Sequence, residues 1–572
     1  MGSRKLVITL LSVTLLFSSS IPAFADKPPR RILSGWLPDY SLSRNLPTVE
    51  GNLDLIRDVS PFWYGLTGET SIKDKYALGR YTTPKTQVIA RLKANNILLL
   101  PTITDDNGKL VLANMLAKES SRNNIVQSLK ALVLSQNYDG IDLDFETFYT
   151  KDGRSSWPAL KPNWILFIQQ LSNELRAQGK LLSVTTPPDF AKETKRAGNS
   201  VYSWAEIGPY IDRLRIMAYD FSTSSPGPIG PIAWTEDAVK YAVTQMPASK
   251  VFLGIPGYGR DWVTKVEGIC PSAFASSVVV GAKAAVVMRE ALNLARNNNA
   301  VPVYNEKHAE STFTYRKTYM DPTNSSIFCT ASRTVWFPDE RSYAIRTNLV
   351  GKYRLGGIAV WTFGMENVAA MSAVREIAKS IAPDQVVATI STETEQITYG
   401  SILNLSATFK LPDKTPVSAL NVRFEIKNSN DANWRSIAAG TTDAAGLISI
   451  PLVVGEKSSI RLVSEGSWER DEGRTAEKTI SVVPKILLPL PTSIKAGATY
   501  PVTGQLLPRI AGLKLAVLQD GKPFGSVTTD VNGNFNLTIA PATTGVHTYQ
   551  LLIDAGPKNS AASSELFTVL VR

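Results

Sequence analysis

The sequence predicts an α/β protein in which an eight-stranded parallel (β/α)8 barrel precedes two all-β sandwiches. Two observations predict this fold class. Strand-like and helix-like segments alternate up to about residue 382, which is typical of a parallel sheet covered by helices. After about residue 383 the helical periodicity stops, and short alternating strands with Gly, Asp-Gly and Asn-Gly turns continue to the C-terminus.

The predicted barrel strands are short apolar runs, and eight of them are the number that closes a barrel. They lie at about 32–37, 57–66, 96–104, 138–146, 181–187, 213–220, 251–258 and 356–363. The segments between them are predicted helices, and the one at 163–178 shows apolar residues at three- and four-residue steps and ends at Gly179. These helices lie at about 84–95, 120–136, 163–178, 235–246 and 366–381.

The domain boundaries follow from changes in this pattern. Residues 26–382 form the predicted barrel domain. The stretch at about 263–345 is too long for one strand-to-helix connection, so we expect a small α+β insertion before the last strand. We expect the two β-sandwiches at 384–482 and 485–572, joined near Pro484.

The N-terminus has the composition of a secretory signal peptide. Arg4 and Lys5 precede an apolar run from Leu6 to Phe17, and Ala23-Phe24-Ala25 supplies a small-x-small cleavage site. We therefore expect residues 1–25 to be removed and the mature protein to be secreted, extracellular and soluble. The apolar run is short for a bilayer and no later stretch is long enough, so we expect no membrane span. We also expect a monomer.

The charge of the chain excludes one class of partner. The net charge is +11 and the pI is about 9.3, yet charged residues make up only 19% of the chain and form no dense Lys/Arg run. We therefore expect no nucleic-acid partner. The positive excess could favour association with an anionic cell wall, or it could be a solvated surface with no partner.

Cysteine and histidine are scarce. The chain has two cysteines, Cys270 and Cys329, and two distant histidines, His308 and His547. Because this set cannot build a usual zinc site or a Ser-His-Asp or Cys-His nucleophile, we expect no metal and no cofactor. In an exported protein we expect a Cys270–Cys329 disulfide that pins the insertion, and two separately buried thiols are the alternative.

One strand end carries an unusual row of acids. Residues 139–146 read Asp-Gly-Ile-Asp-Leu-Asp-Phe-Glu, so Asp142, Asp144 and Glu146 alternate with apolar residues and would project from one face of a strand. Carboxylates stacked on one buried face repel each other and lose hydration, which pushes a pKa upward. Such a row suits a site that keeps one acid as a proton donor. The alternative is an exposed strand with a solvated acidic face.

The acidic row and three further segments resemble glycoside hydrolase family 18 in sequence order. The spacing Asp-x-x-Asp-x-Asp-x-Glu is similar to the family's active-site signature, and the resemblance covers about residues 32–380. The other matching segments are Met217-Ala218-Tyr219-Asp220, Pro256-Gly257-Tyr258-Gly259-Arg260-Asp261-Trp262 and Gly356-Gly357-Ile358-Ala359-Val360-Trp361. The resemblance implies a (β/α)8 TIM barrel whose site residues lie at the carboxyl ends of the strands.

The resemblance also implies a mechanism in which the substrate assists. Glu146 would protonate the glycosidic oxygen, and the 2-acetamido carbonyl would attack the anomeric carbon to give an oxazolinium intermediate. Asp144 would orient the acetamido N–H, and Asp142 would share a proton with Asp144. Tyr219 would donate to the acetamido oxygen, and Asp220 would line the same pocket.

Six further positions are candidates for the surroundings of the substrate. Trp361 would form an apolar floor for the sugar, and Met217 would pack under the site. Tyr258 would either touch substrate or only hold its own loop together. Trp36, Trp63 and Tyr64 lie at the ends of early strands and are candidate glycan subsites.

Three functional classes follow. The first is a secreted retaining hydrolase of N-acetylglucosamine polymers, chitin or peptidoglycan. Departures from chitinases, such as Asp144-Phe145-Glu146 in place of Asp-Trp-Glu, resemble the spore-cortex and cell-wall N-acetylglucosaminidase branch. The second is a catalytically silent glycan-binding protein of the cell wall, although such lectins usually lose the glutamate that is present here as Glu146. The third is a wall-associated structural protein with a vestigial barrel.

The two sandwiches share a repeated turn. Thr442-Asp443-Ala444-Ala445-Gly446 precedes one alternating strand, and Thr529-Asp530-Val531-Asn532-Gly533 precedes another. This repeat indicates two related modules. They resemble bacterial immunoglobulin-like domains, and their few aromatic residues favour a spacer or wall-proximal role over dedicated glycan binding.

Overall fold

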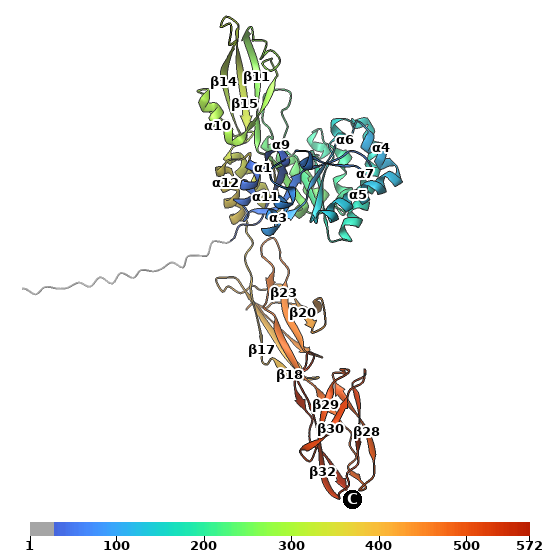
Figure 1. Cartoon of the computed structure of the whole chain (residues 1–572). Helices are drawn as coiled ribbons and strands as arrows, with labels where there is room; N and C mark the ends of the chain where they lie inside the picture. Colours follow the sequence, from blue (N-terminus) through green and yellow to red (C-terminus); the bar gives the residue numbers. More distant parts are fainter. Residues whose placement is uncertain (1–27, 80) are drawn as a thin grey trace, which may run out of the picture. The chain divides into compact units, whose positions relative to one another are not determined.

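The computed structural model describes residues 28–79 and 81–572 (Figure 1). The chain divides into two compact units, one that ends at Ala382 and one that comprises Pro383–Arg572. The predicted signal peptide lies outside the described residues, and the proposal of export rests on sequence alone. None of the helices in the described part of the chain has both the length and the apolar character needed to cross a membrane.

The first unit is built around a parallel barrel, which confirms the predicted fold class. Its strands are β1 (Leu33–Pro38), β2 (Ile56–Phe62), β3 (Tyr64–Leu66), β5 (Leu98–Leu99), β6 (Thr102–Asp105), β7 (Gly140–Asp144), β8 (Leu181–Thr186), β9 (Arg213–Ile216), β10 (Val251–Pro256) and β16 (Gly357–Trp361). The order β3-β6-β7-β8-β9-β10-β16-β1-β2-β5 closes on itself, because β2 continues into β3 and β5 continues into β6 across short breaks. A short strand, β4 (Ile72–Asp74), pairs antiparallel with β3.

Helices form the outer layer of this unit (Figure 1). They are α1 (Leu42–Glu50), α2 (Lys75–Leu78), α3 (Lys85–Ala94), α4 (Val111–Ala117), α5 (Glu119–Ser135), α6 (Thr147–Thr150), α7 (Trp157–Arg176), α8 (Trp204–Ile207), α9 (Ile232–Gln245), α11 (Glu340–Tyr353) and α12 (Val368–Ser380). The long helix α7 buries Trp164, Phe167, Ile168 and Leu171, which recur at the steps of one helical face. The helix begins at Trp157, six residues before the predicted start at 163. Pro158 permits this earlier start, because proline is tolerated in the first turn of a helix.

The predicted α+β insertion is present and forms a separate antiparallel sheet in the order β12-β11-β15-β14-β13. Its elements are β11 (Tyr258–Gly268), β12 (Lys283–Val287), α10 (Met288–Asn297), β13 (Val303–Asn305), β14 (Glu310–Met320) and β15 (Phe328–Phe337). The sheet therefore starts before residue 263 and ends before 345, and α11 packs on α12 beside the barrel. The predicted disulfide between Cys270 and Cys329 is present at the end of this sheet.

The second unit contains two sandwiches, each with a three-stranded sheet that faces a larger one. In the first, the smaller sheet is β17 (Val387–Thr392), β19 (Ile402–Lys410) and β22 (Leu447–Val453), and the larger contains β18 (Gln396–Thr398), β25 (Lys478–Val483), β23 (Ser458–Ser464), β24 (Gly473–Arg474), β20 (Asn421–Asn428) and β21 (Arg435–Thr441). In the second, the smaller sheet is β26 (Lys485–Leu487), β28 (Tyr500–Leu507) and β31 (Asn534–Ile539), and the larger contains β27 (Ser493–Ile494), β34 (Phe567–Val571), β32 (Gly545–Ile553), β33 (Ala562–Ser563), β29 (Lys514–Gln519) and β30 (Lys522–Thr528). Each sandwich has its own apolar core.

The repeated turn makes the same contacts in both sandwiches. The hydroxyl of Thr442 donates to the Val417 carbonyl at 2.6 Å, and the hydroxyl of Thr529 donates to the Ile510 carbonyl at 2.6 Å. In each turn the following aspartate accepts two backbone N–H groups at 2.8 Å, and the glycine has positive φ. The shared contacts support two related modules.

Candidate active site

A cavity of about 320 Å³ opens at the carboxyl ends of the barrel strands. It is lined by Trp36, Asp144, Glu146, Tyr149, Pro187, Pro188, Ala197, Asn199, Met217, Tyr219, Asp220, Trp234, Tyr258 and Trp361. The structure thus brings together the predicted catalytic and substrate-binding residues except Asp142, which lies beneath the cavity, and the candidate subsite residues Trp63 and Tyr64.

Asp144 is the last residue of β7 and is 4% exposed. Its Oδ1 atom makes no hydrogen bond within the described residues. Burial raises the pKa of Asp144 well above its usual value, and the neighbouring carboxylates of Glu146 and Asp142 raise it further. Asp144 therefore tends to hold a proton, as the stacked acids predict.

Glu146 lies beyond the strand, which is shorter than the predicted range 138–146. The strand ends at Asp144, and Glu146 has helical backbone angles and begins the one-turn helix α6. The hydroxyl of Tyr149 on that helix donates to Glu146 Oε2 at 2.7 Å. Burial raises the pKa of Glu146, the Tyr149 hydrogen bond lowers it, Asp220 raises it, and the net shift is upward. A carboxyl group with a raised pKa can donate a proton near neutral pH.

Tyr219 and Asp220 follow β9 and face the same cavity. The Tyr219 hydroxyl is buried and has no hydrogen-bond partner within residues 28–79 and 81–572. Burial raises the pKa of Tyr219 well above its usual value, so it remains a hydrogen-bond donor. Asp220 has φ +60°, a left-handed conformation that aspartate tolerates. It accepts hydrogen bonds from Tyr258 and Arg260, so Tyr258 both lines the cavity and fixes Asp220.

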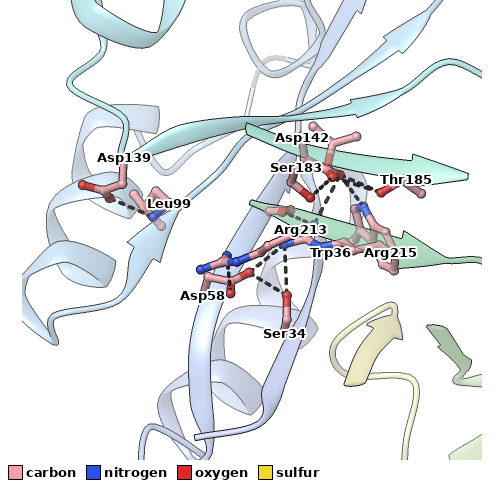
Figure 2. Close-up of polar contacts among 12 residues, drawn as sticks. Ser34, Trp36, Asp58, Leu99, Asp139, Asp142, Ser183, Thr185, Arg213 and Arg215 are labelled. Atoms are coloured by element: carbon pink, nitrogen blue, oxygen red, sulfur yellow. Dashed lines mark hydrogen bonds and ion pairs between the residues drawn. The ribbon is translucent and has the colours of Figure 1, made fainter. Parts of the chain in front are cut away.

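Asp142 is fully buried under the cavity, on the inner face of the barrel (Figure 2). It accepts hydrogen bonds from the side chains of Ser183 at 2.6 Å, Thr102 at 2.8 Å, Thr185 at 3.0 Å and Trp36 at 3.3 Å. The guanidinium of Arg215 lies 3.2 Å from its Oδ2 atom. Among the described contacts, no hydrogen bond joins Asp142 to Asp144. The predicted sharing of a proton is therefore not seen as a direct contact here.

Aromatic side chains form one wall of the cavity. Trp361 lies edge-on to Trp36, with ring centroids 5.5 Å apart, and to Phe62, with centroids 5.1 Å apart. The prediction that Trp63 and Tyr64 form glycan subsites is wrong. Trp63 is fully buried and packs on Tyr76, and Tyr64 is buried with its hydroxyl 2.9 Å from that of Tyr138, so neither lines the cavity.

Several cavity residues are not among the predicted site residues. Tyr149 follows the acidic row by three residues and could be suspected only as a polar aromatic near a strand end. Trp234 lies in the first turn of α9, and Asn199 lies in the long loop after β8. The hydrogen bond from Asn199 to the Pro188 carbonyl at 2.9 Å folds that loop onto itself. Asp139, the first acid of the row, accepts from the Leu99 N–H at 2.8 Å and is structural (Figure 2).

Comparison with known families decides the family of this site. Residues 58–366 match the family model of glycosyl hydrolases family 18, which is more than half of the chain. The chain belongs to glycosyl hydrolases family 18. The resemblance predicted from four sequence segments is therefore confirmed, and this family 18 protein is a glycoside hydrolase. The matched range contains the acidic row and all of the cavity residues except Trp36.

Similar proteins include bacterial glycosylases. The family 18 chain is 25% identical over 276 residues to the uncharacterized glycosylase YvbX of Bacillus subtilis strain 168, covering 48% of this chain and 71% of that protein. It is 25% identical over 293 residues to the cortical fragment-lytic enzyme of the same strain, covering 49% of this chain and 60% of that protein. A solved chitinase structure from Chromobacterium violaceum ATCC 12472 is 24% identical with a TM-score of 0.49, covering 61% of this chain and 98% of that one.

Proposed function

We propose that the protein is an exported, retaining hydrolase that cleaves β-linked N-acetylglucosamine polymers with the help of the substrate's acetamido group. The observation that carries this proposal is a pair of unpartnered polar atoms in the cavity. Asp144 Oδ1 and the Tyr219 hydroxyl are both buried without a hydrogen bond in the described part of the chain. An acetamido group has one N–H donor and one carbonyl acceptor, so it can donate to Asp144 while it accepts from Tyr219.

The residues of the cavity then take defined roles. Glu146 gives its proton to the glycosidic oxygen as that bond breaks. The acetamido oxygen, oriented by Asp144 and Tyr219, forms the new bond to the anomeric carbon and yields an oxazolinium ion. Water adds to the same carbon, reopens the ring and loses its proton to Glu146. Two inversions at one carbon leave its configuration retained.

The substrate is a polymer that carries a 2-acetamido sugar on the non-reducing side of the cleaved bond. The Trp361 ring can stack on the apolar face of that sugar. Both chitin and peptidoglycan meet this requirement, and one relative of the chain is named a cortical fragment-lytic enzyme. The catalytic chemistry is the same for both polymers, so the outer cleft decides between them.

Digestion of purified peptidoglycan and of chitin oligomers tests the proposal. Mass spectrometry identifies the cut bond, and proton NMR of the first product shows whether the β anomer forms. We expect a β product and inhibition by a thiazoline analogue of N-acetylglucosamine, which copies the cyclised intermediate. A covalent ester on Asp144 or Glu146 after treatment with a 2-fluoro sugar would contradict the mechanism. Binding of either polymer without any product would indicate a glycan-binding protein.

A further inference from the structure

The loop between β9 and α9 supplies part of the cavity wall. It comprises residues 217–231, and the structure describes it in full as a segment with neither helix nor strand. Tyr219 and Asp220 lie near its start, and Trp234 follows its end in the first turn of α9. Residues 226–231 read Pro-Gly-Pro-Ile-Gly-Pro, so half of them lack a backbone N–H. A loop of this length keeps one conformation only when other parts of the chain bind its backbone.

Glu310, the first residue of β14 in the insertion, binds the backbone of this loop with both carboxyl oxygens. Its Oε2 atom accepts from the Ile229 N–H at 2.7 Å, and its Oε1 atom accepts from the Gly230 N–H at 2.8 Å. The carbonyl of His308, two residues earlier, accepts from the Ile232 N–H at 3.1 Å. Glu310 is fully buried, and a carboxyl group is stable in such a place only when its oxygens have partners of this kind.

Arg346 on α11 completes the contact. Its Nη2 atom lies 2.8 Å from Glu310 Oε1 and also donates to the Gly230 carbonyl, and its Nη1 atom donates to the Ala309 carbonyl at 3.0 Å. Arg346 is also fully buried. Glu310 and Arg346, called the loop clamp below, therefore bind both the N–H and the carbonyl group of Gly230.

The residues that the loop clamp binds lie directly against the start of the same loop. The Ile229 carbonyl accepts from the Phe221 N–H at 2.8 Å. Gly230 lies so close to the Ala218 carbonyl that a methyl group on its α-carbon would be 2.5 Å from that oxygen. These two contacts lie on either side of residues 219–220 in the sequence, so the position of those residues depends on the backbone that the loop clamp holds.

We propose that Glu310 and Arg346 are positioning residues that fix Tyr219 and Asp220 in the cavity through the backbone of the β9–α9 loop. Neither arginine nor glutamate is among the residues that line the cavity, so both act only through this loop. Asp220 is also bound by two side chains of β11, so the insertion holds the loop near its start and near its end. The effect on catalysis rests on the proposed function, whereas the fixing of the loop does not.

The test compares two double variants of the full chain, each of which removes one buried ion pair and keeps the net charge. Glu310→Gln/Arg346→Met removes the loop clamp. Asp261→Asn/Arg333→Met is the matched control, because this pair joins β11 to β15 inside the insertion, with Arg333 Nε 2.9 Å from Asp261 Oδ1. In the described part of the chain, the side-chain hydrogen bonds of the control pair go to other residues of the insertion.

Hydrogen exchange of the loop amides needs no substrate. In the wild type we expect the amides of Phe221, Ile229 and Gly230 to be protected although they lie in a loop. Their exchange should be faster by about tenfold or more without the loop clamp and close to the wild-type rate in the control. Rapid exchange in the wild type, or the same change in both double variants, would overturn the proposal. If the variant without the loop clamp fails to fold, the wild-type measurement still decides the question.

A thiazoline analogue of N-acetylglucosamine reports on the acetamido pocket itself. At a temperature where both double variants are folded, we expect its inhibition constant to rise by about tenfold or more without the loop clamp, and kcat/KM to fall by up to about 10²-fold. The control should keep values close to those of the wild type. An equal loss in both double variants would show that the pair only supports the fold and would overturn the proposal.

Two further outcomes separate this proposal from the proposed function. Faster exchange of the loop amides with an unchanged inhibition constant would overturn the positioning role of the loop clamp. A wild type that neither hydrolyses chitin or peptidoglycan nor binds the thiazoline analogue would refute the proposed function, and the exchange rates would still decide whether the loop clamp fixes the loop.

Discussion

The hydroxyl of Tyr149 donates to Glu146 Oε2 at 2.7 Å. The two residues lie three positions apart, and Glu146 has already left the strand that carries Asp142 and Asp144. Tyr149 lies on the one-turn helix α6, so this hydrogen bond fixes the carboxyl group of Glu146, the proposed acid, to that helix. It also favours the ionised form of Glu146 and opposes the burial that raises the pKa of this group.

Replacement of Tyr149 by Phe should move the basic limb of the kcat/KM profile to higher pH. The hydrogen bond lowers the pKa of Glu146, so its loss raises that pKa, and the acid stays protonated to a higher pH. A net hydrogen bond of about 0.5–1.5 kcal/mol corresponds to a shift of about 0.4–1 pH unit. The control is Tyr81→Phe, which removes a hydrogen bond to Asp39 and does not line this cavity. A basic limb that stays in place or moves to lower pH would contradict the assigned role.

Replacement of Glu146 by Gln should abolish hydrolysis while the fold and glycan binding persist. The amide keeps the shape of the side chain but cannot donate the required proton, and general acid catalysis contributes about 10²–10⁴-fold. Release of reducing ends from chitin oligomers and peptidoglycan measures the loss, and circular dichroism checks the fold. Glu376→Gln on the exposed face of α12 serves as the control and should retain full activity. Substantial activity in the Glu146→Gln variant would mean that another group is the acid.

Replacement of Asp144 by Asn should stabilise the protein at high pH and not at low pH. The folded-state pKa of Asp144 is raised, so its favourable contribution exists below the pKa of the unfolded chain and is lost as the pH rises through the folded value. The amide that replaces the carboxyl group carries no charge at any pH. The difference in Tm between variant and wild type should therefore grow above about pH 4.

Each kcal/mol gained corresponds to about 2 °C for a domain of this size. Differential scanning calorimetry across pH measures the effect. Hydrolytic activity of Asp144→Asn should fall strongly at the same time, because the amide cannot replace the carboxyl group that orients the acetamido N–H. A Tm difference that is constant with pH would indicate that Asp144 titrates at its ordinary value in the folded protein.

The barrel is predictable from sequence because each strand is a short apolar run and strand alternates with helix. The helix α11 is not predictable in this way. Its buried face includes Ser342, Arg346 and Thr347, and the charge of Arg346 is satisfied by Glu310 in the insertion. These polar residues interrupt the apolar pattern that Tyr343, Leu349 and Val350 would otherwise give the buried face, and the predicted insertion extended over the first part of the helix. The partner that permits a buried arginine is 36 residues away and cannot be seen locally.

The acids of the site are predictable because the side chains of a strand alternate with a period of two. The residues that surround these acids cannot be predicted in the same way. Arg215 touches Asp58, which is 157 residues away in sequence, and both lie on the inner face of a barrel that exists only after all its strands have paired. The contact of Tyr149 with Glu146 depends on where β7 ends, and alternation alone placed that end two residues too late.

The disulfide supports a final prediction about the insertion. Cys270 and Cys329 close a loop with a sequence separation of 59 residues, which contributes about 4 kcal/mol in the chain-entropy description. Both cysteines lie in the insertion, whereas Asp144 and Glu146 belong to the barrel. We therefore expect Cys270→Ser/Cys329→Ser to lower the stability of the insertion and to leave the catalytic acids in place. Hydrogen exchange of the amides of β11, β14 and β15, which lie side by side in Figure 1, reports this local loosening.

The effect on activity should appear in KM more than in kcat. The strand β11 begins at Tyr258, whose hydroxyl holds Asp220 at the wall of the cavity, so a looser insertion weakens substrate binding before it disturbs Glu146. Addition of a reducing agent to the wild type should reproduce the variant, and the variant itself should not respond to it. Two reactive thiols in the native protein, or unchanged exchange rates in the insertion, would contradict the bridge as a stabilising element.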